Sequence, residues 1–210
     1  MAAKRIQTKG ILVKLLEKGI RILVIKECKK IRNLKIDIVS SSFQIIRGEI
    51  QKINIFAEDI NYKEFFFDEI KLEANQIKIN FKLRNQELFF ENNPKIKFKV
   101  SLSQNSLRKI LSSSSWNCIG NMISKEILNQ EKFEDIIIED SQLLMKASKK
   151  NIAINQEKQI NIKTDKGKIY LENKTYNKSI EIPIEDKIYI EKIKIENNLI
   201  NIFANSSISF

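Results

Sequence analysis

Residues 10–39 read GILVKLLEKGIRILVIKECKKIRNLKIDIV, and the spacing of the apolar residues changes within this stretch. Up to residue 25 the charged side chains recur every three or four positions, which is the period of an α-helix; they are Lys14, Glu17, Lys18 and Arg21. From residue 34 onward apolar and polar side chains alternate, which is the period of a β-strand. The stretch therefore predicts an amphipathic helix followed directly by a strand.

The rest of the chain continues the strand pattern with one helical interruption. Residues 65–84 predict a long strand whose apolar residues change parity near Asn75 and Gln76, so we expect a bulge or bend there. Ser103 is typical of a helix N-cap, and residues 116–128 predict a second helical segment. The predicted fold class is α+β, with an N-terminal amphipathic helix against a long curved, mostly antiparallel sheet and a short central helical pair. We expect residues 1–9 to form a basic N-terminal tail and residues 10–210 a single α+β domain.

The positive charge of the chain is concentrated near its N-terminus. The 210 residues carry a net charge of +11, and residues 1–35 alone hold eleven basic and two acidic side chains, a balance of +9. A localised excess of this size indicates an acidic partner surface. The candidate headgroup or surface-binding residues are Lys14, Lys18, Arg21, Lys26, Lys29 and Lys30.

Two interpretations of the predicted N-terminal helix remain open. Either its apolar face packs on the sheet of the same domain and leaves a solvated charged stripe, or the helix lies on an anionic membrane surface. Both hold together if the apolar face is buried and the basic end faces lipid headgroups. Charges interrupt the apolar run and no small-residue cleavage site follows it, so it predicts neither a secretory signal nor a spanning helix. We therefore expect a cytoplasmic protein, peripheral on the membrane under the second interpretation.

Composition excludes several common catalytic and metal sites. The sequence has no histidine, which removes Ser-His-Asp and Cys-His nucleophile pairs and every His-ligated metal site. The two cysteines, Cys28 and Cys118, are far apart, and the five glycines are too scattered for a glycine-rich nucleotide loop. We expect no catalytic residue, no metal, no cofactor and no enzymatic activity.

Three segments of the sequence carry a family resemblance. Residues 36–50 (IDIVSSSFQIIRGEI) combine a strand, a short link and a glycine-containing entry to the next strand. Residues 53–55 and 70–72 belong to the pair of alternating strands that follows, and residues 100–111 (VSLSQNSLRKIL) lead from a strand into a helix start. In these segments the chain resembles the LmeA-like phospholipid-binding family of bacterial proteins. The resemblance implies an apolar groove between sheet and helix that holds phospholipid acyl chains, and action beside membrane-bound enzymes without chemistry of its own.

The apolar candidates for lipid contact lie in the helix and in an aromatic cluster. Three consecutive phenylalanines begin at residue 65, and alternation along a strand prevents all three from facing one side. They predict core packing, in a strand covered on both sides or in a turn whose side chains pack back, or else an exposed aromatic tip at the bilayer interface. The same alternatives, core packing or an interfacial anchor, apply to the only tryptophan. The candidate groove or membrane contacts are Leu12, Leu15, Leu16, Leu23, Phe65, Phe66, Phe67 and Trp116.

The predicted function is non-enzymatic binding of anionic phospholipid, or peripheral attachment to a membrane surface, through an apolar groove and the basic N-terminal helix. The alternative is a scaffold protein whose apolar helix recruits a partner protein, such as a membrane-bound one. A nucleic-acid partner is disfavoured, because the basic residues alternate with Ile and Leu, and an apolar stripe gains nothing from a phosphate backbone.

Overall fold

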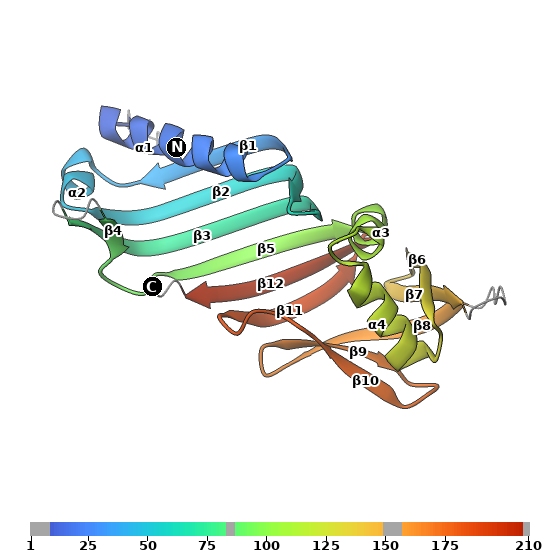
Figure 1. Ribbon diagram of the computed structural model, residues 1–210. Helices are drawn as coiled ribbons and strands as arrows, with labels where there is room; N and C mark the ends of the chain where they lie inside the picture. Colours follow the sequence, from blue (N-terminus) through green and yellow to red (C-terminus); the bar gives the residue numbers. More distant parts are fainter. Residues whose placement is uncertain (1–8, 83–86, 149–156, 208–210) are drawn as a thin grey trace, which may run out of the picture.

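The computed structural model describes residues 9–82, 87–148 and 157–207. Within these ranges the chain is an α+β fold in which strands predominate (Figure 1). The helices are α1 (Ile11–Glu27), α2 (Ser42–Ile46), α3 (Gln104–Ser112) and α4 (Asn117–Leu128). The strands are β1 (Lys30–Val39), β2 (Glu49–Tyr62), β3 (Phe65–Lys82), β4 (Glu87–Phe90), β5 (Lys95–Ser103), β6 (Lys132–Glu139), β7 (Gln142–Ser148), β8 (Glu157–Asp165), β9 (Lys168–Asn173), β10 (Lys178–Ile182), β11 (Ile188–Glu196) and β12 (Leu199–Ser207).

These strands form two antiparallel sheets. The larger sheet has the order β1-β2-β3-β5-β12-β11, with β4 also paired to β3, and the smaller has the order β10-β9-β8-β7-β6. This corrects the prediction of one long sheet. After α3 and α4, β6 begins a second sheet, while β11 and β12 return to the first, where β12 pairs with β5.

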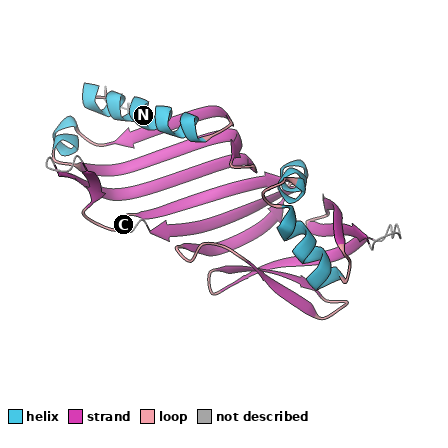
Figure 2. Cartoon of the chain, in the orientation of Figure 1, coloured by secondary structure: helices cyan, strands magenta, loops and turns pink. Residues whose placement is uncertain are grey.

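Each end of the larger sheet has its own apolar core. At the β1 end, α1 packs on the sheet, and Val13 of α1 is buried together with Ile36 and Ile38 of β1. At the other end, α3 and α4 pack with β6 and β7 around Ile127 and Met145. Figure 2 shows the helices gathered in these two places, α1 and α2 in one and α3 and α4 in the other. The predicted N-terminal helix is confirmed; of the predicted basic tail, residues 1–8 lie outside the described residues.

Two predicted local features are confirmed. Gln76 has a φ of 51°, and Ala74 and Ile77 on either side of it both join the core beneath α1, so the change of parity is a bend at this residue. It is not a bulge, because the pairing of β3 with β2 keeps one register from Ala74 to Ile77. Ser103 caps α3, because its hydroxyl oxygen accepts a hydrogen bond from the Ser106 N–H.

Candidate functional site

Helix α1 is apolar on the side that meets the sheet. Val13 is almost completely buried, and Leu16, Ile20 and Val24 pack beside it against the core of β1, β2 and β3. These four residues recur every three or four positions, so they form one stripe along the helix. This stripe is the packed face that the first interpretation of the helix requires.

The opposite side of α1 is also apolar, and the described part of the chain leaves it uncovered. Its exposed fractions are 77% for Ile11, 59% for Leu15, 57% for Ile22 and 49% for Ile25, and Leu23 on the flank of the helix is 64% exposed. Since successive helical residues are about 100° apart, Ile11, Leu15 and Ile22 point almost directly away from the packed stripe. We call this side the outer face of α1.

Positive charge is interleaved with the apolar side chains of the outer face. Four exposed basic residues lie on or beside it: Lys14, Lys18, Arg21 and Lys26. Among the residues that the structure describes, none of these four forms an ion pair. The two acidic residues of α1, Glu17 and Glu27, lie about 55° and about 25° from the mean direction of the packed stripe. The outer face therefore combines large apolar side chains with positive charge alone.

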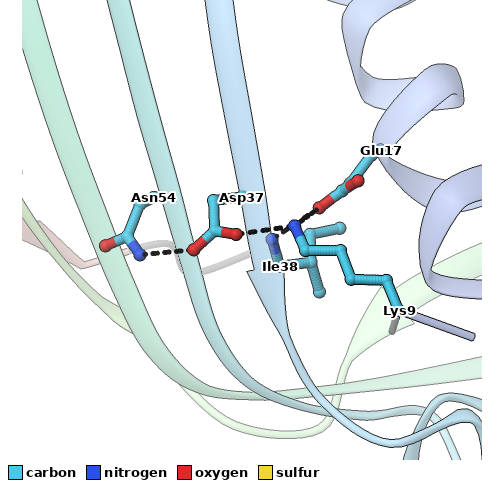
Figure 3. A network of polar contacts seen from close by, with 5 residues as sticks. All are labelled: Lys9, Glu17, Asp37, Ile38 and Asn54. Carbon is cyan, nitrogen blue, oxygen red and sulfur yellow. Dashed lines mark hydrogen bonds and ion pairs between the residues drawn. The ribbon is translucent and has the colours of Figure 1, made fainter. Parts of the chain in front are cut away.

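A polar network fixes α1 to strand β1, as Figure 3 shows. The Lys9 ammonium donates to the Glu17 carboxylate in α1 and to Asp37 Oδ1 in β1, the latter at 2.6 Å. Glu17 Oε1 also accepts the backbone N–H of Ile38 at 2.9 Å. The hydrogen bond from Lys9 lowers the pKa of Asp37 below its ordinary value. The ionised carboxylate is thus favoured in the folded state, and its contribution to stability is present at neutral pH and lost as the pH falls through the lowered pKa.

We expect Glu17→Ala to loosen α1 from the sheet. The variant leaves the Ile38 N–H without its acceptor and Lys9 with one carboxylate, at a cost of about 1–2 kcal/mol. Hydrogen exchange of the Ile38 amide should become about tenfold faster. Glu17→Gln keeps a side-chain oxygen for this N–H and should retain most of the protection. Equal exchange rates in Glu17→Ala and the unaltered protein would show that the network does not hold the helix.

The other two predicted basic residues lie at the start of β1, just beyond the C-terminal end of α1. Lys29 and Lys30 are both exposed. Lys30 Nζ lies 3.7 Å from the Asp59 carboxylate, which also binds Arg32. Lys30 is therefore partly neutralised, whereas Lys29 extends the basic surface of α1 beyond the helix.

The predicted aromatic candidates lie away from α1, where the β2–β3 turn meets the α3–α4 link. Phe65, Phe66, Phe67 and Trp116 are half-buried and pack against the core around α3 and α4, and Phe67 also packs against the core beneath α1. The Phe65 and Trp116 rings have centroids 4.0 Å apart, and the Trp116 indole N–H donates to the Lys63 carbonyl at 3.1 Å. Of the two interpretations, core packing describes these residues and an exposed aromatic tip does not.

Helix α2 is a surface element that the sequence analysis did not predict. Its side chains Phe43 and Ile46 are 67% and 73% exposed. A capping box starts the helix: the Ser41 hydroxyl oxygen accepts the Gln44 N–H, and the Gln44 side chain accepts the Ser41 N–H. The S-x-x-Q spacing is the signal that could have identified it.

An apolar pocket of about 420 Å³ opens between α1, α2 and the paired strands β2 and β3. Its aliphatic lining consists of Leu16, Ile45, Ile46, Ile50 and Ile79, and Arg47, Gly48, Asn80 and Glu91 complete it. Leu16 is the predicted groove residue that lines this pocket. Leu12 and Leu23 lie on the flank of α1, where Leu12 is half-buried and Leu23 is exposed, and Leu15 lies on the outer face.

Within the described ranges, no helix is long and apolar enough to cross a membrane, and no three potential metal-ligating side chains from His, Cys, Asp or Glu cluster together. A scan against protein-family models and searches of curated proteins and of solved structures found no match to this chain.

Proposed function

We propose that this protein is a non-enzymatic, peripheral membrane protein that binds anionic phospholipid surfaces through the outer face of α1. The observation that carries the proposal is that large apolar and basic side chains share a helix face left uncovered by the described part of the chain. A helix that lies in the plane of a bilayer uses both kinds of side chain, the apolar ones at the acyl boundary and Lys or Arg at the headgroup phosphates.

The two kinds of side chain contribute comparable amounts to binding. A basic residue near an anionic surface contributes about 1 kcal/mol, so Lys14, Lys18, Arg21 and Lys26 together supply about 4 kcal/mol. Fully burying an aliphatic side chain contributes about 1.5–3 kcal/mol, and partial burial of the five exposed ones adds a similar total. Since the protein needs both contributions, we expect binding to anionic bilayers and little binding to neutral ones.

Sedimentation with vesicles tests this proposal. We expect the full chain to pellet with vesicles that contain phosphatidylglycerol and to stay in the supernatant with pure phosphatidylcholine. Salt should weaken the binding, because the Debye length falls from about 10 Å at 0.1 M to about 3 Å at 1 M. A chain that pellets with neither vesicle would overturn the proposal, and the outer face of α1 would then be assigned to a partner protein.

For a bound lipid molecule, the pocket between α1 and α2 is the proposed place for an acyl chain. Five aliphatic side chains line it, and the exposed guanidinium of Arg47 at its rim suits a phosphate oxygen. The resemblance to the LmeA-like family implies a groove of this kind between sheet and helix. Native mass spectrometry of the protein purified from its own host should detect about one phospholipid per chain. A lipid-free chain that still pellets with anionic vesicles would support attachment to the membrane surface and would overturn the proposal that the pocket holds an acyl chain.

A further inference from the structure

We infer that α2 is a second membrane-binding element, which inserts Phe43 and Ile46 into the acyl boundary of an anionic bilayer and places Arg47 at the headgroup phosphates. This inference rests on the proposed function of α1. It adds a contact that lies outside the basic N-terminal segment, and it fixes which end of the molecule enters the membrane most deeply.

The first support is the way α2 divides its apolar side chains. Ile45 packs inward against the core beneath α1, whereas Phe43 and Ile46 are mostly exposed. Residues three apart in a helix lie on the same side, so Phe43 and Ile46 project together from one short turn. The Ser41 capping box holds that turn in place through its two hydrogen bonds. The large apolar side chains of Phe43 and Ile46 are therefore exposed to water on an ordered helix, α2.

The second support is the contact between the start of α2 and the start of α1. A Cβ added at Gly10, just before α1, would lie 2.2 Å from the Ser42 hydroxyl oxygen, so the starts of the two helices are in direct contact. Leu16 of α1 and Ile46 of α2 also line the same pocket. In Figure 1 both helix starts lie at one end of the larger sheet. We call this end the tip; its exposed apolar side chains are Ile11, Leu15, Phe43 and Ile46.

The charge around the tip selects an anionic bilayer as its partner. The Arg47 guanidinium lies over the Phe43 ring at 5.6 Å, and the nearest acidic group that it pairs with, Glu49, is 3.8 Å away in an exposed pair. Exposed pairs of this kind contribute little, so the positive charge stays available. A second copy of the chain that paired with the tip through two-fold symmetry would bring Lys14, Lys18 and Arg47 near their own equivalents, which is repulsive. The lipid phosphates at the surface of a bilayer attract the basic side chains, and the hydrocarbon layer beneath them accommodates the apolar ones.

The substitution Phe43→Trp gives a direct test. The natural chain has one tryptophan, Trp116, which is half-buried and lies beyond the opposite end of β2, a strand of 14 residues and so about 45 Å long. With vesicles of phosphatidylglycerol and phosphatidylcholine whose acyl chains are brominated, we expect emission from the new tryptophan to shift to the blue and to be quenched. Emission from Trp116 in the natural chain should remain unchanged.

A matched control uses Tyr189→Trp. Tyr189 is 55% exposed, in β11 at the other side of the larger sheet, and a tryptophan there should be neither shifted nor quenched. If the natural chain pellets with anionic vesicles while Phe43→Trp is not quenched, the inference about α2 fails and the proposed function of α1 stands. If neither protein pellets, both fail.

The double variant Phe43→Ser/Ile46→Ser provides a second measurement. Both side chains are exposed, so its thermal stability should match that of the unaltered protein, whereas its affinity for anionic vesicles should fall about tenfold or more. Unchanged affinity together with an unquenched Phe43→Trp would overturn the inference.

Discussion

Vesicles that contain phosphatidylglycerol should bind the triple variant Lys14→Glu/Lys18→Glu/Arg21→Glu at least about 100-fold more weakly than the natural chain. Removing three basic side chains deletes about 3 kcal/mol of attraction, and the new carboxylates add repulsion from the lipid phosphates. The fold should be unaffected, because the three side chains are exposed and form no ion pair among the described residues. Vesicle sedimentation measures the affinity, and far-UV circular dichroism checks the fold.

The control for this variant makes the same change of net charge elsewhere. Lys125 in α4, Lys166 in the β8–β9 turn and Lys174 after β9 are all exposed. Lys125→Glu/Lys166→Glu/Lys174→Glu should keep nearly all of the vesicle affinity, since these residues lie outside α1 and α2. If both triple variants lose affinity equally, net charge alone governs binding and the outer face of α1 has no special role.

The substitution Gly48→Ala should produce the largest loss of stability. Gly48 joins α2 to β2 with a φ of +73°, and a Cβ there would lie 1.9 Å from the Ile79 carbonyl oxygen. The Gly48 carbonyl also accepts the Ile79 N–H at 2.8 Å, so the two strands have little room to separate. The left-handed backbone and the overlap together cost about 2–4 kcal/mol. The melting temperature should fall by about 5–15 °C.

Gly19→Ala is the matched control for this position. Gly19 lies in the exposed part of α1, and a Cβ there meets nothing within 4 Å. Replacing a helical glycine by alanine stabilises a protein by about 0.5–1 kcal/mol, so the melting temperature should rise slightly. A Gly48→Ala variant as stable as Gly19→Ala would show that the α2–β2 link is not constrained as described.

The position of α1 was predictable because its pattern is strong, but its orientation was not. Helical spacing identified residues 10–25, and the helix occupies Ile11–Glu27. Lys14, Glu17, Lys18 and Arg21 form a single stripe by spacing, yet in the structure Glu17 bonds to β1 while the three basic residues remain in solvent. Apolar residues on two sides of a helix leave open which side packs, and only the sheet beside it settles the choice.

Helix α2 and the division into two sheets escaped prediction for different reasons. The apolar residues between Ser41 and Gly48 come directly after a predicted strand and were not predicted as a helix, although the Ser41–Gln44 spacing fits a capping box. The return of β12 to β5 joins residues about 100 positions apart, as the pair Ile200 and Leu102 shows. No local pattern carries such a pairing, because alternation identifies a strand and not its neighbour.

Strand β1 stands at the edge of the larger sheet, and α1 with Glu17 occupies part of that edge. An open strand edge presents unpaired backbone N–H and C=O groups. If this edge is uncovered, a strand of another chain can pair with it through backbone hydrogen bonds. If α1 left the sheet to enter lipid, neighbouring copies concentrated on the membrane would polymerise along β1. Under the proposed function, we therefore expect α1 to contact the bilayer while it remains packed on the sheet, so that the protein binds the membrane without a change of shape.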